Sequence, residues 1–415
     1  MKRLAVLLLV WMAFFGFGVH AQGVLRMAGF GPPPTAQIER FTEQTGIAVE
    51  YEWVSGSYNF MEKVVVWTIA GTLPDVLAIP YWGLPQMATQ GSLRPLDDLM
   101  EQDVEFRDGF LPQGMESFRW EGQLYGVPWV LAQQTILFDR SLFLEAGIPT
   151  PYDLIAQDQW SMENLILAAR KLTDPVPDGS GFNTIGLFTR TDQMSYYAPL
   201  IWALGGDILA NDGRTLLLRQ QSSQDAVVRL AELFTERIFL SNSVRGEYGL
   251  DYMEVLTQRD VGMRAFGVYL LQDIKNANPM LSESIDIAPY PAYDGVGTNG
   301  IDPGAIGISS TTEQPEVAWQ FLKCALADPV LEPGLPAVRQ HFDVWVAYME
   351  DHFGVSAARY LQVAGDSLRL SPRAVNPDVE QAICLPLQEA LLGRRTISQV
   401  LDRIELELGF LLEVQ

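Results

Sequence analysis

The sequence has very little of the chemistry that metal sites and disulfide frameworks need. Only three histidines and two cysteines occur among its 415 residues. His341 and His352 lie eleven positions apart, which does not place two ligands on one face of a helix, so no metal site is expected. Cys324 and Cys384 fall in separate helical stretches, where two buried thiols are favoured over the single disulfide that an oxidising compartment would also permit.

Positive charge is also scarce. The chain has 28 Lys and Arg residues against 51 Asp and Glu residues, a formal net charge of −23. Nucleic acids and anionic membrane surfaces are bound by clustered Lys and Arg, so this balance excludes nucleic acid as a partner. The remaining composition, 48% hydrophobic and 19% charged residues, is that of a folded globular protein. At about 150 residues per domain the length indicates roughly two to three domains, which leaves room for a ligand cleft between them.

A long hydrophobic run occurs at one place, the start of the chain. Lys2 and Arg3 precede residues 4–18, which carry no charge, and the small residue Ala21 follows. This is the pattern of a secretory signal peptide over residues 1–21, cleaved after Ala21. A run of 15 residues is shorter than the about 20 that a spanning helix needs, so an uncleaved anchor is the weaker alternative.

No later run reaches the length of a membrane span, and no cysteine lies near the cleavage point to carry a lipid. We therefore expect an unlipidated, freely soluble protein of the periplasm. Removal of the signal peptide takes away two positive charges and no negative one, which changes the formal net charge from −23 to −25.

Strand-like and helix-like segments alternate from residue 24 onward. One helix is expected to stop at Thr45 and Gly46, and the next to run over about 58–70 and stop at Gly71. This spacing indicates a parallel sheet with helices on its faces, and such sheets bind ligands beyond the carboxyl ends of their strands. The expected strands are 24–28, 47–54 and 74–79, and the loops at their carboxyl ends are 29–31, 55–57 and 80–82.

The rest of the chain continues the α/β pattern. Two helices are expected to open on capping boxes, one over 311–314 before Pro315 and one over 396–399. The other expected elements are a hairpin at 122–129, strands at 134–138, 286–289 and 305–308, and helices at 161–172, 196–204, 224–236 and 269–276.

Seven short segments match a known family in the family's own order. Among them are Ala-Gly-Thr-Leu-Pro-Asp-Val at 70–76 and Leu-Tyr-Gly-Val-Pro-Trp at 124–129. On these residues the sequence resembles the extracellular solute-binding proteins of sugar ABC importers, the family that includes maltose-binding protein. The segments span nearly the whole mature chain and are 38–41 with 45–50, 70–76, 90–99, 124–129, 137–143 with 146–149, 204–207 and 314–322.

This resemblance implies a two-lobed periplasmic binding protein fold of the α/β class, in which each lobe is a mainly parallel sheet flanked by helices. The chain would cross between the lobes three times, with hinge strands near 130–131 and 288–289. A ligand would bind between the lobes, and the permease of an ABC importer would recognise the closed monomer. Lobe one would hold 22–131 and 288–330, and lobe two 132–287 and 331–415.

Aromatic side chains stand at the expected ligand-binding loops. A neutral sugar presents apolar C–H faces and a rim of hydroxyls, so its site needs aromatic platforms and a few polar groups. Tyr81 and Trp82 follow the third strand, and Phe30 follows the first strand between two glycines. Ligand binding and packing against a neighbouring helix are the alternatives for these side chains.

The resemblance adds candidates in the second lobe. It implies stacking aromatics where Tyr196 and Tyr197 open a helix, and where Phe266 and Tyr269 flank a strand-to-helix turn. Core packing is the alternative for both pairs. Trp129, beside the hinge, is expected to pack rather than to bind.

The polar candidates are fewer. Gln133 lies just beyond the hinge strand, and Asp302 lies in a glycine-containing approach to the next strand. Each is a candidate ligand contact, with a solvated loop as the alternative. Arg264 is expected to pair with Asp260 rather than to face the cleft.

Three functions remain open on the sequence. The first is non-enzymatic binding of a mono- or oligosaccharide for an ABC importer, and the second is the same fold holding a polyamine, which the acidic charge would attract. The third is a secreted carbohydrate-active enzyme that uses paired carboxylates. The sequence contains no Gly-x-Ser-x-Gly elbow, phosphate loop or metal cluster, so no catalytic residue and no cofactor are predicted. Sugar binding is the preferred hypothesis.

Overall fold

The computed structural model describes residues 23–258, 260–364, 368–374 and 376–413. The predicted signal peptide and its cleavage point lie outside these ranges. Among the described residues, no helix is both long and apolar enough to cross a membrane. Both cysteines are free, which confirms thiols over the disulfide, but only Cys384 is buried as predicted, since Cys324 is partly exposed.

The first third of the chain forms the parallel strands that the sequence predicts. β1 lies between β2 and β3 and is parallel to both. Each connecting helix ends at a glycine in the left-handed conformation, Gly46 at φ 73° and Gly71 at φ 65°, a conformation that costs little without a Cβ. The elements are β1 (Leu25–Gly29), α1 (Thr35–Thr45), β2 (Val49–Trp53), α2 (Ser57–Ala70) and β3 (Val76–Pro80).

One long strand, β6 (Val127–Asp139), joins two parts of the molecule, the part that contains β1 to β3 and the part that contains β10 (Val261–Gly267). Its first half pairs with β12 (Asn299–Ile308), and from Gln134 onward it pairs with β10 and β11 (Ile285–Ala288). The sequence predicted only its second half as a strand, because Pro128 and Trp129 were assigned to a hairpin. A proline is tolerated there because the pairing of β6 with β12 is irregular at this point, where the register shifts between Gly304 and Ala305. The hairpin itself is shorter and earlier, β4 (Arg119–Trp120) with β5 (Gln123–Leu124).

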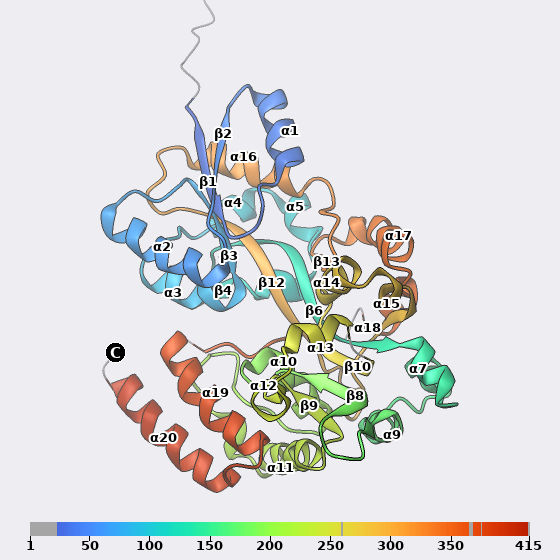
Figure 1. The fold of residues 1–415 in the computed structure, drawn as a ribbon. Helices are drawn as coiled ribbons and strands as arrows, with labels where there is room; N and C mark the ends of the chain where they lie inside the picture. Colours follow the sequence, from blue (N-terminus) through green and yellow to red (C-terminus); the bar gives the residue numbers. More distant parts are fainter. Residues whose placement is uncertain (1–22, 259, 365–367, 375, 414–415) are drawn as a thin grey trace, which may run out of the picture.

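The strands form a continuous sheet in the order β2-β1-β3-β12-β6-β10-β8-β7. β12 is antiparallel to both β3 and β6, and β6 is antiparallel to β10, so the expectation of mainly parallel sheets is corrected to mixed ones. The cause is that β6 spans both parts of the molecule. The later strands β11 and β12 lie beside it and run in the opposite direction. Figure 1 shows β6 and β12 side by side, with β1 to β3 above them and β8 to β10 below.

The remaining strands extend this sheet. β8 is parallel to both β9 and β10, while β13 pairs with β6 and β14 with β12. The last two helices, α19 and α20, pack together and against α11. The assignment of residue ranges to two lobes stays a prediction. The bounds of these strands are β7 (Asp174–Pro175), β8 (Phe182–Thr189), β9 (Phe239–Ser241), β13 (Leu335–Pro336) and β14 (Leu368–Leu370).

Helices cover both faces of the sheet, and most of those predicted are present within a few residues of their expected bounds. The helices not yet given are α3 (Leu84–Thr89), α4 (Asp97–Gln102), α5 (Val104–Asp108), α6 (Pro112–Glu116), α7 (Arg140–Glu145), α8 (Pro151–Ala156), α9 (Met162–Leu172), α10 (Met194–Ala203), α11 (Gln221–Thr235), α12 (Val244–Tyr248), α13 (Tyr252–Gln258), α14 (Leu270–Ala277), α15 (Pro279–Ser284), α16 (Pro315–Leu326), α17 (Phe342–Phe353), α18 (Ala357–Ala364), α19 (Pro377–Leu391) and α20 (Ile397–Glu413), with short 3₁₀ turns η1 (Tyr81–Gly83), η2 (Leu217–Arg219) and η3 (Arg339–His341).

The two predicted capping boxes have different outcomes. At α20, the Thr396 amide donates to Gln399 Oε1 and the Gln399 amide donates to Thr396 Oγ1, which confirms the box. At α16 the prediction is wrong, because the helix begins at Pro315 and no side chain caps it. Thr312 instead donates a hydrogen bond to Asp75 at 2.6 Å and so ties the loop to the start of β3.

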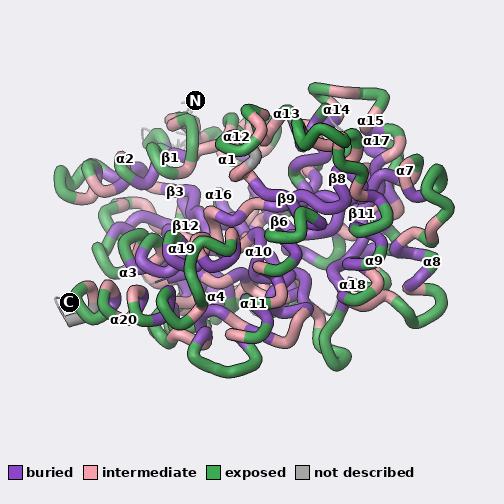
Figure 2. Tube along the Cα trace, turned by 60° about the horizontal axis from the view of Figure 1, so that its bottom comes forward, coloured by how far each residue is buried: buried purple, intermediate pink, exposed green. Residues whose placement is uncertain are grey.

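Two apolar cores stabilise the fold. One extends from β1 to β3 and their helices through the middle of the sheet to β10, α14 and α17, and within it the rings of Phe41 and Phe321 meet edge to face at 5.2 Å between centroids. The other lies between β8 and β10 and the helices α9, α10, α11 and α19. Figure 2 shows the strands buried inside and the exposed residues gathered on the outer helices. The packing of these cores holds the carboxyl ends of β1 and β3 in place beside the region between the two parts of the molecule.

Candidate functional site

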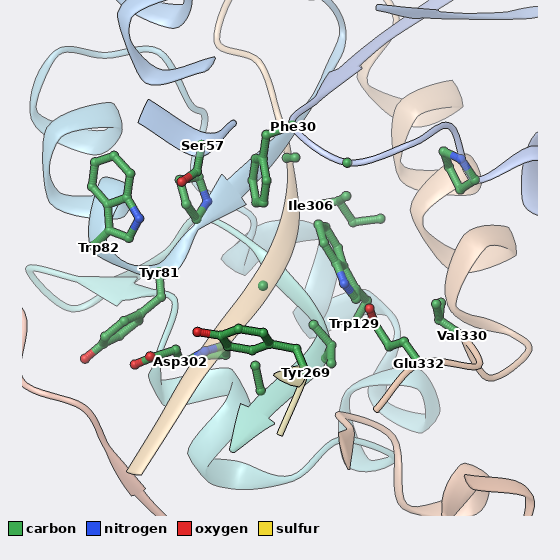
Figure 3. Close-up of a pocket in the computed structure, with 18 of the residues that line it drawn as sticks. Phe30, Ser57, Tyr81, Trp82, Trp129, Tyr269, Asp302, Ile306, Val330 and Glu332 are labelled. Atoms are coloured by element: carbon green, nitrogen blue, oxygen red, sulfur yellow. The ribbon is translucent and has the colours of Figure 1, made fainter. Parts of the chain in front are cut away.

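A cavity of about 670 Å³ lies where the two parts of the molecule face each other. Its walls come from the carboxyl ends of β1 and β3, the first turn of α2, the middle of β6 and β12, the start of α10 and the first turn of α19. This volume lies within the range of small-molecule sites, about 300–1,000 Å³. The predicted position beyond the ends of the first strands is therefore where the structure has its cavity (Figure 3).

Three aromatic rings form the wall on the β1–β3 side. Trp82 stacks on Tyr58 with ring centroids 4.6 Å apart and an interplanar angle of 27°. Tyr81 is held from behind, because the Arg373 guanidinium lies 4.7 Å from its ring centroid and its hydroxyl donates to the Ser371 carbonyl. These contacts fix the rings before a ligand arrives, which lowers the entropic cost of binding.

Two tyrosines form the opposing wall. The hydroxyls of Tyr196 and Tyr269 are hydrogen-bonded to each other. Behind them, the ring of Phe266 lies 4.6 Å from that of Tyr196, and the Arg190 guanidinium lies 4.8 Å from the same ring. Arg190 is itself paired with Asp192 at 2.8 Å. Tyr196 and Tyr269 are therefore fixed as a unit.

Carboxylates supply the charge of the cavity. Gln134 Nε2 donates to Asp302 Oδ2 at 2.8 Å, and burial raises the pKa of Asp302. Burial, reinforced by the negative charge of Asp302, raises the pKa of Glu380 to about 7. Glu332 stands next to Trp129, and burial raises its pKa to about 7 as well.

The donor set does not fit a metal ion or an anionic ligand. Among the described residues, no group of three or more His, Cys, Asp or Glu side chains is placed to hold a metal. No Lys, Arg or His side chain is among the described residues that line the cavity. The walls offer aromatic faces, hydroxyls and carboxylates, a set suited to a ligand with apolar faces and hydrogen-bond donors.

Comparison with known proteins identifies the family. Residues 28–331 match the family of bacterial extracellular solute-binding proteins. The chain belongs to this family. The resemblance seen in the sequence is confirmed, and because the members are binding proteins the prediction that the chain is not an enzyme is confirmed as well.

Individual relatives are distant. The chain is 26% identical over 283 residues to a protein of Brucella abortus (strain 2308) named as a binding protein, and the match covers 68% of this chain but only 64% of that one. An ABC substrate-binding protein of Listeria monocytogenes, solved in complex with cycloalternan, is 17% identical, with a TM-score of 0.74 over 94% of this chain and 99% of that one.

A second solved structure shows the same fold. It is the sugar-binding protein of Xanthomonas citri, at 14% identity, with a TM-score of 0.73 over 94% of this chain and 98% of that one. At these identities the likeness shows the fold alone. The solute-binding fold predicted from the sequence is thus present, with mixed rather than mainly parallel sheets.

Six of the nine predicted binding residues line the cavity of this solute-binding protein. Loop residues dominate the set, because loops at the carboxyl ends of strands can turn large side chains into the cavity without leaving a core position empty. The six are Phe30, Tyr81, Trp82, Tyr196, Tyr269 and Asp302.

The other three residues lie behind the walls, which corrects their expected position. Tyr197 is fully buried, and its hydroxyl donates to Cys384 Sγ at 3.9 Å. It points away from the cavity that Tyr196 lines, because neighbouring residues on a helix point about 100° apart. Phe266 supports Tyr196 from within the core. Gln133 points to the opposite face of β6 from Gln134, where its Oε1 accepts from the Leu335 amide at 3.1 Å.

Sequence reasoning missed several residues of the wall. Trp129 is expected from the sequence to pack, but it lines the cavity from β6. Tyr58 follows the loop after β2 and could have been found by the rule that found Tyr81. Glu332 and Glu380 come from the last fifth of the chain, where no pattern indicated that segments return to the cavity.

Proposed function

We propose that the protein binds a mono- or oligosaccharide in this cavity and delivers it to the permease of an ABC importer. The observation that supports this most is the pair of opposed aromatic walls, with Trp82 and Tyr81 on one side and Tyr196 and Tyr269 on the other. Such walls match the apolar faces of a sugar ring, and hydroxyls and carboxylates between them accept hydrogen bonds from its rim.

We also propose a cellular location for the protein and a hinge motion between its lobes. The signal peptide 1–21 directs the chain to the periplasm and is cleaved after Ala21, and the mature protein is an unlipidated monomer. Lobe one is 22–131 with 288–330, and lobe two is 132–287 with 331–415. The change of partner strand between Gln133 and Gln134 of β6 supports a hinge there, just beyond the position expected from the sequence.

A polyamine ligand remains the second candidate. The observation in its favour is the presence of three carboxylates and no basic side chain among the described residues of the cavity wall. The aromatic walls of the cavity do not distinguish a sugar from a polyamine, because cations also bind over aromatic faces.

Isothermal titration of the protein purified from the periplasm tests the proposal. We expect a panel of mono- and oligosaccharides to contain at least one ligand that gives saturable heat with a stoichiometry near one, and we expect chromatography to recover that ligand unchanged. A panel that gives no heat, with intact folded protein, contradicts carbohydrate binding. Recovery of a cleaved sugar contradicts the role as a binding protein.

A further inference from the structure

The cavity carries three carboxylates, and no Lys, Arg or His is among the described residues that line it. Asp302 lies on β12, Glu332 lies between α16 and β13, and Glu380 lies in the first turn of α19. Among the described residues none of the three forms an ion pair, although the same structure holds many ion pairs at its surface. A cavity made only to accept hydrogen bonds from a neutral sugar could use amide and hydroxyl oxygens, without the cost of burying like charges together.

The carboxylates fall into two groups along the cavity. Asp302 lies between Tyr81 and Tyr269, while Glu332 lies on the other side next to Trp129 (Figure 3). Glu380 lines the same cavity from the first turn of α19, and the negative charge of Asp302 raises its pKa, so we place Glu380 with Asp302. Two carboxylates that share one end of a cavity repel each other, so a cation between them relieves that repulsion.

The arginines nearest to this end are already engaged. Arg190 Nε and Nη2 donate to the two carboxylate oxygens of Asp192, at 2.9 and 2.8 Å. Arg373 lies behind the ring of Tyr81 and donates to the carbonyls of Ser117 and Arg119, at 2.7 and 3.3 Å. Neither guanidinium lines the cavity, so a positive charge beside Asp302 and Glu380 would come from the ligand.

We infer that the ligand carries a protonated amine, as an amino sugar does, and that its ammonium group binds between Asp302 and Glu380 beside the rings of Tyr81 and Tyr269. An ammonium gains from two carboxylates and from the electron-rich faces of the rings at the same time. This inference rests on the proposed carbohydrate function, and it names the class of carbohydrate.

The protonation of the empty cavity agrees with this arrangement. Burial raises the pKa of Asp302, and burial with the Asp302 charge raises the pKa of Glu380 to about 7, so the empty site holds its negative charge at a cost. An ammonium would stabilise both ionised carboxylates. Glu332, at the other end with Trp129, is available for a hydroxyl or a second amine of a longer ligand.

The test uses matched pairs of sugars that differ only by a hydroxyl or an amine. Glucose with glucosamine, galactose with galactosamine, mannose with mannosamine, and cellotriose with the chitosan trimer are titrated into the full mature protein at pH 7. The N-acetylated trimer serves as a neutral ligand of larger size, and spermidine serves as an amine without a sugar. We expect the amine member of a pair that binds to bind about 10- to 100-fold more tightly than its partner.

Isosteric variants locate the ammonium. Asp302→Asn and Glu380→Gln should each abolish most of this preference, about 10-fold or more, so that the two members of a pair bind with nearly equal affinity. The matched control is Glu332→Gln, which removes a carboxylate at the other end and should keep the preference of the monosaccharides. A thermal unfolding midpoint close to that of the wild type shows that each variant is folded.

The outcomes separate the inference from the proposed function. Equal affinity for both members of every pair that binds overturns the inference and leaves carbohydrate binding in place. Binding of spermidine without any sugar supports the ammonium site and overturns the carbohydrate function. A preference that survives in both Asp302→Asn and Glu380→Gln overturns the assigned position, and no binding by any of these probes overturns the inference.

Discussion

The side-chain amide of Gln193 donates a hydrogen bond to the hydroxyl of Tyr58 at 3.3 Å. Tyr58 belongs to the first turn of α2, and Gln193 directly precedes α10, so the bond joins elements on opposite sides of the cavity. The same Tyr58 ring stacks on Trp82. This contact therefore forms only when the two sides of the cavity are close together.

Replacing Tyr58 with Phe should weaken ligand binding without loss of fold. The ring still stacks on Trp82, but the hydrogen bond across the cavity is lost, and one such bond contributes about 0.5–1.5 kcal/mol. We expect the dissociation constant measured by titration to rise about 2- to 10-fold. Tyr125→Phe is the control, because its hydroxyl donates to Gln123 Oε1 and Tyr125 is not among the lining residues, so the affinity of this variant should match the wild type.

Replacing Trp82 with Ala tests the aromatic wall. The indole lines the cavity and its loss removes a stacking face, so affinity should fall by about 10-fold or more. Phe410→Ala is the matched control, since that ring is 67% exposed on α20 and is not among the lining residues. Unchanged affinity in Trp82→Ala would contradict the role given to this wall.

The local elements of the fold could be predicted because their signals are local. Gly46 and Gly71 end helices where predicted, since only the backbone conformation of one residue is involved. The path of β6 could not be predicted, because its two halves pair with strands more than a hundred residues away and Pro128 interrupts the pattern of the strand. The direction of β12, and with it the mixed sheet, depends on the same distant pairing.

Only those site residues that follow the carboxyl end of a predicted strand could be located from the sequence. Phe30, Tyr81 and Trp82 follow parallel strands whose carboxyl ends meet at one edge, so a general rule places them together. Glu332 and Glu380 arrive from the far end of the chain by tertiary packing, which leaves no local trace in the sequence. The choice between Tyr196 and Tyr197 needed the exact rotation of α10.

Stability should fall as the pH rises, through the two glutamates of the cavity. Their pKa is about 7 in the folded protein, above the ordinary 4.5, so the folded state holds more protons between these values. Their contribution is fully present below pH 4.5 and is lost as the pH rises through 7. We expect Glu332→Gln and Glu380→Gln to be more stable than the unliganded wild type by about 1–2 kcal/mol at pH 8.

Chemical denaturation at pH 5 and at pH 8 measures this difference. The advantage of each variant should be small at pH 5 and should grow toward pH 8. Glu145→Gln, an exposed position on α7, should show the same difference from the wild type at both values. A constant offset for Glu332→Gln and Glu380→Gln would contradict the protonation of these carboxylates.

Both cysteines should titrate as thiols without a reducing agent. Cys324 lies on α16 and Cys384 on α19, and both are free. Cys384 is buried, and burial raises the pKa of its thiol to about 12, so it should react with a thiol reagent only after denaturation. Denatured protein should yield two thiols per chain, and a reducing agent should leave the unfolding midpoint unchanged. A yield of no thiols would indicate a disulfide.

The neighbours Tyr196 and Tyr197 should separate binding from stability. Tyr197 is fully buried in the core with α19, so Tyr197→Ala should lower the free energy of unfolding by about 3–5 kcal/mol, while the folded fraction binds ligand with unchanged affinity. Tyr196→Phe removes the hydroxyl that holds Tyr269 in the wall, so it should weaken binding about 2- to 10-fold with little effect on unfolding. The reverse pattern would place Tyr197, and not Tyr196, against the ligand.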